Sequence, residues 1–361
     1  MKSYNEVAND VFRRRDEYER KQCHREVIYR RVSTAMSAVA IVVMLLFTVG
    51  TGYVLAASVG IIDDFLGIFR NRTDAPLSTN QQQFLEDAVA EIGESISCNG
   101  YTVTAQGAFT DGTVAYVLVD VEAPEGVAID GLGIGFDTGA KEIIRGDNPD
   151  KLLNITGLSI AYIPVEDHDE KENTTSVLIQ ISCVRLNGST YSFADGYSRY
   201  LELEDIHFFG DEYPYTRTTI SEGSWNFELV FNEVQEGEVE LLAAPIHMQI
   251  QRITVTDYVD ATIHSIRLKG MGVMCYYTID AEDVQEPGDF GDVQIVMKDG
   301  RVVNAYPKSA TAVENGTPGN TVFCCYYITQ APVIFEDVDH VMIGENYTVS
   351  FPDVFDGEYA D

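Results

Sequence analysis

The sequence is short of basic residues, and this shortage limits its partners. Only 24 Lys and Arg stand against 57 Asp and Glu, so the formal net charge is −33. A chain with this charge repels a phosphate backbone, and we therefore exclude nucleic acid as its main partner. The content of 45% hydrophobic and 22% charged residues is typical of globular proteins, which excludes a collagen-like or low-complexity chain.

The sequence also lacks the motifs that carry enzyme chemistry. Its six His residues form no His-Glu-x-x-His motif, no Gly-rich loop opens a helix, and there is no Gly-x-Ser-x-Gly elbow. The acidic stretches 167–172 and 280–292 do not match the ligand spacing of an EF-hand, so solvated loops are the better interpretation. We expect no enzyme activity, no cofactor and no metal site.

Charge is distributed unevenly along the chain. Residues 1–33 hold nine Lys or Arg against six acidic residues, and a run without any charged residue follows from Val32 to Ile62. Within it, residues 34–58 are predicted to form an apolar transmembrane helix, long enough to cross a hydrocarbon core of about 30 Å. The basic side should remain in the cytoplasm, which places the large acidic remainder outside the cell membrane. A cleaved signal peptide and a buried core helix are the alternatives.

The N-terminal segment 1–33 is predicted to be an amphipathic helix. It opens with a capping box, Ser3-Tyr4-Asn5-Glu6. One face carries apolar residues at helical spacing, and its partner-binding candidates are Tyr4, Val7, Val11 and Phe12. This face either lies on anionic lipid or docks into a groove of a cytoplasmic protein.

Residues 59–83 are predicted to be a juxtamembrane segment and a short polar stalk, because 73–83 are rich in Thr, Ser, Asn and Gln. Folded structure should resume near Phe84. The helical spacing of apolar residues predicts a brief helix over 83–95.

After this helix the pattern predicts strands. Short runs rich in β-branched and aromatic residues are separated by turn pairs such as Asn99-Gly100, Asp111-Gly112 and Asp299-Gly300. Two sets of such runs, divided by the acidic stretch 233–240, predict a mainly β protein with two tandem Ig-like β-sandwich domains, 84–236 and 237–361.

Five cysteines lie in the part predicted to be outside the membrane, where disulfides can form. Cys275 and either Cys324 or Cys325 occur in similar strand contexts, so a disulfide between Cys275 and Cys324 is one possibility. Buried free cysteines that pack as small apolar residues are the alternative.

Several segments resemble a known family. The basic start Met1-Lys-Ser-Tyr-Asn-Glu and the single span are followed by Ser97-Cys-Asn-Gly-Tyr-Thr-Val-Thr104, Gly223-Ser-Trp-Asn-Phe-Glu-Leu-Val230 and Val333-Ile-Phe-Glu-Asp-Val-Asp-His340. This arrangement is similar to the single-pass membrane proteins of Gram-positive bacteria that carry a domain of unknown function and are described as anti-sigma-factor-like. The resemblance implies a membrane regulator whose cytoplasmic segment restrains a sigma factor.

The segment 1–33 departs from the zinc-binding anti-sigma module. That module needs a His and a Cys-x-x-Cys motif, whereas Cys23 and His24 are the only Cys and His residues of this segment. Sigma-factor binding would therefore depend on the short helix alone. The alternative function is a surface-anchored, non-catalytic module that binds a glycan, a peptide or an envelope protein through its β region.

Overall fold

The computed structural model divides the chain into two compact units, Met1–Gly60 and Ile61–Asp361. The residues that it describes are 60–73, 75–129, 133–137, 145–146, 155–165, 172–185, 199–209, 217–229, 231–232, 238–241, 245–252, 258–279, 287–313, 321–344 and 347–351. The predicted cytoplasmic helix 1–33 and the predicted span 34–58 lie outside them. Within the described part of the chain, no helix combines the length and apolar character that membrane crossing requires.

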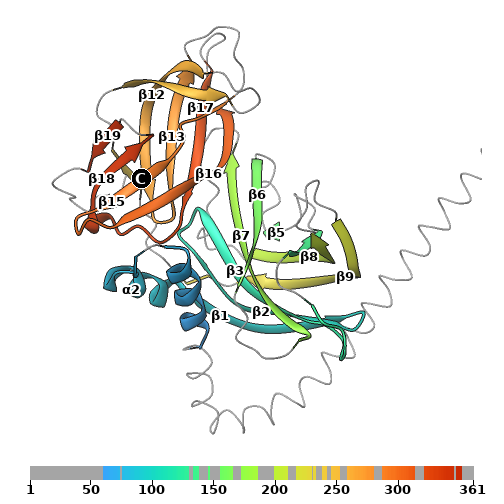
Figure 1. Ribbon diagram of the computed structural model, residues 1–361. Coiled ribbons are helices and arrows are strands. Elements are labelled where there is room, and N and C mark those ends of the chain that lie inside the picture. Colours follow the sequence, from blue (N-terminus) through green and yellow to red (C-terminus); the bar gives the residue numbers. More distant parts are fainter. Residues whose placement is uncertain are drawn as a thin grey trace, which may run out of the picture. The chain divides into compact units, whose positions relative to one another are not determined.

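The described part is mainly β, as predicted (Figure 1). Its helical elements are residues 60–71, α2 (Thr79–Ala88) and the 3-10 turn η2 (Phe335–Asp337). The strands form three sheets, which we name A, B and C.

Sheet A contains five antiparallel strands in the order β1 (Ala90–Cys98), β2 (Tyr101–Thr110), β3 (Val114–Glu122), β7 (Thr174–Arg185) and β6 (Ile155–Pro164). The central strand of sheet B is β8 (Arg199–Phe209). It pairs with each of the other three strands, β4 (Ile134–Asp137), β5 (Arg145–Gly146) and β9 (Arg217–Leu229).

The central strand β3 of sheet A is buried on both faces, and its sequence shows why. Its run Val-Ala-Tyr-Val-Leu-Val is apolar at every position, whereas a strand with one wet face would alternate. Ala115, Val117 and Val119 share a core with Leu203 and Trp225 of sheet B. Sheets A and B therefore pack face to face in a sandwich-like pair.

The other face of sheet A belongs to a second core. Tyr116 and Leu118, which alternate with the residues above, cluster with Phe65 and Phe69 of the 60–71 helix. The same cluster continues into sheet C through residues such as Ile263. Sheet A is therefore shared by two apolar clusters, one with sheet B and one with the 60–71 helix and sheet C.

Sheet C is a single continuous sheet among the described residues. Its strands follow the order β14 (Gly288–Asp289), β11 (Ile246–Arg252), β12 (Tyr258–Lys269), β13 (Gly272–Ile279), β17 (Val322–Thr329), β16 (Val302–Val313), β15 (Val293–Met297), β18 (Val338–Ile343) and β19 (Tyr347–Ser350), and β10 (Glu238–Glu240) pairs with β12. An Ig-like sandwich has two separate sheets. In the described topology the two halves are joined, because β16 pairs with β17 along residues 305–313 and with β15 along residues 302–305.

The stalk predicted for 59–83 is wrong for the residues that the structure describes. Phe65 and Phe69 lie on one face of the 60–71 helix and are fully buried, and Leu77 is also in the core. The helix predicted for 83–95 begins earlier and ends earlier, because Ser78 caps α2 and β1 starts at Ala90. Phe65, Phe69 and Leu77 are thus core residues, and Ser78 and Gln81 form the cap of α2.

Candidate functional site

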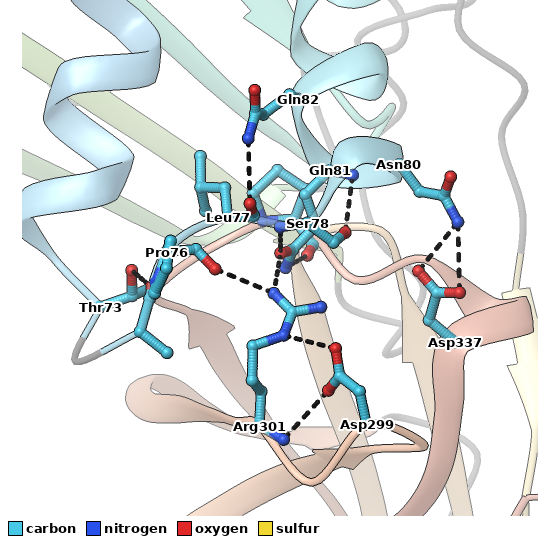
Figure 2. A network of polar contacts seen from close by, with 12 residues as sticks. Thr73, Pro76, Leu77, Ser78, Asn80, Gln81, Gln82, Asp299, Arg301 and Asp337 are labelled. Carbon is cyan, nitrogen blue, oxygen red and sulfur yellow. Dashed lines mark hydrogen bonds and ion pairs between the residues drawn. The ribbon is translucent and has the colours of Figure 1, made fainter.

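The first candidate site is a polar network at the start of α2 (Figure 2). The Gln81 backbone N–H donates to Ser78 Oγ at 3.1 Å, and the Ser78 N–H donates to Gln81 Oε1 at 2.8 Å. This reciprocal capping box satisfies two N–H groups that the helix cannot bond itself. The buried Gln81 side chain also donates to Pro332 O at 2.6 Å, which anchors α2 beside sheet C.

Arg301, just after the Asp299-Gly300 turn between β15 and β16, completes this network. Its Nη1 donates to Pro76 O at 3.1 Å and to Gln81 Oε1 at 2.9 Å, and its Nε donates to Asp299 Oδ2 at 2.7 Å. Hydrogen bonds from the backbone N–H and the side chain of Arg301 hold the pKa of Asp299 below its ordinary value. The network, which we call the α2 clamp, ties the segment before β1 to the β15–β16 turn.

The 60–71 helix is held by aromatic contacts. Phe65 meets Phe109 edge-on at 5.4 Å between ring centroids, and Phe69 meets Tyr116 edge-on at 5.5 Å. Phe109 and Tyr116, on neighbouring strands, stack at 4.9 Å. Such pairs stabilise a contact by about 0.5–1.5 kcal/mol beyond the area that they bury. The helix is therefore an integral part of the β unit.

A buried carboxylate connects the β2–β3 turn with the β12–β13 turn. Asp111 accepts hydrogen bonds from the backbone N–H groups of Thr113 and Val114, both at 2.8 Å, and of Met271 at 2.6 Å. Burial raises the pKa of Asp111, although these bonds and nearby Lys269 oppose the increase. Asp111 thus joins sheet A to sheet C across the shared core.

The second candidate site is a groove of about 850 Å³ in sheet C. Its described lining comes from β11, β12, β15, β18, β19 and the 290–292 connection: Met248, Gln249, Gln251, Tyr258, Phe290, Gly291, Asp292, Gln294, Met342, Gly344 and Tyr347. We call it the sheet C groove. Its volume falls in the range of small-ligand pockets.

A third cluster contains metal-ligand side chains but already holds a cationic side chain. Potential ligand atoms of Asp137, Asp205 and His207 lie within 4.8 Å of one another. Arg217 forms an ion pair with Asp137, and its Nη2 lies 2.5 Å from His207 Nε2. A guanidinium only donates, so Nε2 accepts and the ring is neutral. Burial, followed by Arg217, lowers the pKa of His207, in agreement with a neutral ring.

The candidate residues predicted from the sequence have different outcomes. Tyr4, Val7, Val11 and Phe12 lie outside the described residues, so their role stays a prediction. Cys275 and Cys324 are buried free thiols on neighbouring strands. The register places Cys275 opposite Cys325 and Cys324 opposite Tyr276. Because adjacent residues of a strand point to opposite faces, the Cys275–Cys324 disulfide is wrong.

Sequence reasoning missed the α2 clamp and the groove. The clamp had a detectable signal, since Ser78-Thr-Asn-Gln81 fits the capping-box pattern. The groove had none, because its lining is drawn from residues 248–347 and depends on how the strands pair.

Comparisons with known proteins leave the family open. No family model matches the chain, and no curated protein matches it. A solved structure described as the conserved domain protein from Bacillus anthracis is similar at a TM-score of 0.42 and 15% identity, covering 76% of this chain and 82% of that one. A similarity of this size establishes neither a shared fold nor a shared function.

Proposed function

We propose that the chain is a membrane-anchored signalling regulator of the anti-sigma-factor type. In this proposal residues 34–58 span the cell membrane, residues 1–33 bind a sigma factor in the cytoplasm, and the mainly β unit is an extracytoplasmic sensor. The two β regions 84–236 and 237–361 would form that sensor.

The observation that favours a regulator is the attachment of the chain immediately after the proposed span. The 60–71 helix buries Phe65 and Phe69 against Phe109 and Tyr116, and the α2 clamp fixes the next helix. A passive anchor needs only a flexible tether. A rigidly packed segment at this position would instead transmit a change in the β unit to the chain that enters the membrane, because packed cores shift between discrete arrangements and do not deform continuously.

The alternative is a surface-anchored binding module, and the sheet C groove favours it. The groove is a concave surface with polar and apolar side chains, as binding pockets have. The two functions differ in what residues 1–33 do, since a binding module uses them only as an anchor.

Co-purification of the full-length chain separates these functions. The tagged chain would be solubilised from its native membrane, and bound sigma factors would be identified by mass spectrometry. We expect recovery of a sigma factor that is lost in the Val11→Asp and Phe12→Asp variants, because a charge on the apolar face opposes docking. Asn9→Asp, which adds the same charge on the opposite face, is the matched control and should retain the partner.

Failure to recover any sigma factor from the unaltered chain would contradict the regulator and favour the binding module. Equal recovery with Val11→Asp, Phe12→Asp and Asn9→Asp would contradict docking through the apolar face.

A further inference from the structure

We propose that the sheet C groove binds a neutral oligosaccharide. The inference deepens the proposed function by naming the class of ligand that the sensor unit recognises, and it rests on that function for the position of the groove outside the membrane. The argument depends on the shape of the groove, its hydrogen-bonding groups and its charge.

The groove is held in shape by bonds that do not involve a ligand. The Gly344 backbone N–H donates to Asp292 O at 2.8 Å, which ties the end of β18 to the 290–292 connection. Tyr347 Oη donates to His247 O at 2.8 Å and joins β19 to β11. A site that is already formed loses less conformational entropy when it binds its ligand.

The polar lining suits hydroxyl groups. Gln249, Gln251 and Gln294 each carry an amide that both donates and accepts, as a sugar hydroxyl does. Gln294 Nε2 donates to Asn304 Oδ1 at 2.9 Å and Gln249 Nε2 donates to Asp260 Oδ1 at 3.3 Å, which orients both amides and leaves their carbonyl oxygens to accept. Asp292, which is exposed, adds a carboxylate acceptor. Several amides on one concave surface can therefore satisfy several hydroxyls at once.

The groove also has an exposed aromatic ring. Tyr258 is 64% exposed, the largest exposure among the exposed large apolar side chains of the described residues. A pyranose ring has one face of C–H groups, which packs on an aromatic ring through dispersion and the negative charge of the π face. Met342 adds a polarizable apolar contact to the lining. A flat apolar surface next to amides matches the two kinds of surface of a sugar.

Charge argues against the other ligands of similar size. None of the described residues that line the groove is Lys or Arg, and the chain carries a net charge of −33, so an anion would be repelled. Asp292 is the single carboxylate in the described lining, which is too few carboxylate ligands for a Ca²⁺ site. A neutral, hydroxyl-rich ligand fits what remains.

Calorimetric titration of the full-length chain in nanodiscs, without glycoside detergents, tests this inference. The probes are chitohexaose, cellohexaose and maltohexaose. We expect at least one to bind, about tenfold more weakly in Tyr258→Ala, because the aromatic contact is lost. Tyr258→Phe keeps the ring and should bind like the unaltered chain. Gln251→Ala should also weaken binding, whereas Gln83→Ala, an exposed glutamine on α2, should not.

The inference is overturned if none of the three probes binds at millimolar concentration. It is also overturned if Tyr258→Ala binds with unchanged affinity, or if hexalysine binds at Tyr258 and the saccharides do not. Sigma-factor recovery is a separate measurement. Saccharide binding without sigma-factor recovery would support this inference while contradicting the regulator, and the reverse result would contradict this inference alone.

Discussion

Asp111 shows how one residue can hold two sheets together at an electrostatic cost. Its carboxylate is withdrawn from water, which disfavours the charged form, yet three backbone N–H groups from two turns converge on it. Removing one hydrogen-bonding partner of a buried group costs about 1–3 kcal/mol. The residue is therefore sensitive both to substitution and to pH.

We predict that Asp111→Asn destabilises the chain by about 1–3 kcal/mol, because the amide nitrogen cannot accept one of these hydrogen bonds. The pKa of Asp111 in the folded protein lies above the unfolded value of 3.8. Its titration therefore contributes stability that is fully present below pH 3.8 and is lost as the pH rises through the folded pKa. The stability difference between the unaltered chain and Asp111→Asn should shrink as the pH increases above 4, as measured by urea unfolding at several pH values.

Asp299 provides a control, because its pKa is shifted in the opposite direction to that of Asp111. The pKa of Asp299 in the folded protein is lowered, so its contribution is present above pH 3.8 and is lost as the pH falls through the folded pKa. Asp299→Asn should therefore change the pH dependence in the other direction. Parallel pH profiles for the two variants would contradict the assignment of Asp111.

At the scale of elements, the 60–71 helix fits closely against one point of β2. A Cβ built on Gly107 would lie 2.8 Å from Ile61 Cγ2 and 2.9 Å from the Ala90 backbone oxygen. Gly107 is thus the position where the helix and β1 approach the strand too closely for a side chain. Gly67, within the helix, has no atom within 4 Å of the equivalent position.

We predict that Gly107→Ala destabilises the chain by about 1–3 kcal/mol, because the added methyl forces the helix or β1 away from β2. Gly67→Ala should instead stabilise it by about 0.5–1 kcal/mol, because alanine loses less entropy in a helix. Urea unfolding gives both values, and hydrogen exchange should show faster exchange in the 60–71 helix of Gly107→Ala only. A neutral Gly107→Ala variant would mean that the helix does not lie against β2.

At the scale of the whole molecule, sheet A contributes to two apolar clusters, one shared with sheet B and one shared with sheet C, although no strand of sheet C pairs with a described strand of sheets A or B. The chain contains a single tryptophan, Trp225, which is fully buried between sheets A and B. Cys275 and Cys324 are buried in sheet C. Burial raises the pKa of Cys324 to about 12, so this thiol is unreactive in the folded state. Each of the two clusters therefore carries its own probe.

We predict that Trp225 fluorescence and the reactivity of Cys275 and Cys324 report one unfolding transition with the same midpoint. Cooperative unfolding is expected because β3 contributes to both clusters: Val117 packs in the cluster of Trp225, and Tyr116 packs in the cluster that continues into sheet C. Urea titration with alkylation and peptide mapping measures both signals. Two separated midpoints would instead favour two independent domains, 84–236 and 237–361, as the sequence predicts.

The sequence by itself determined the strands and turns with strong local signals. β13 (Gly272–Ile279) and β15 (Val293–Met297) are runs of the β-branched and apolar kind that the sequence predicts to be strands. Gly100, Gly112 and Gly300 occupy the predicted turns with φ of 86°, 86° and 84°. Strands such as β8 and β16 were missed, because acidic residues interrupt the first and Pro307 lies beside a register shift in the second. These weaker strands are stabilised by their neighbours, which a local pattern does not reveal.

Only the tertiary structure decided which residues meet. The register between β13 and β17 places Cys275 opposite Cys325, and the neighbouring Cys324 points to the other face of the sheet. The burial of Phe65 and Phe69 depends on a surface provided by β2 and β3, so their own segment resembled a juxtamembrane stalk. The sheet C groove brings together residues up to about a hundred positions apart. Local sequence fixes backbone preference, whereas contacts at such separations depend on strand pairing and the burial of shared apolar surface.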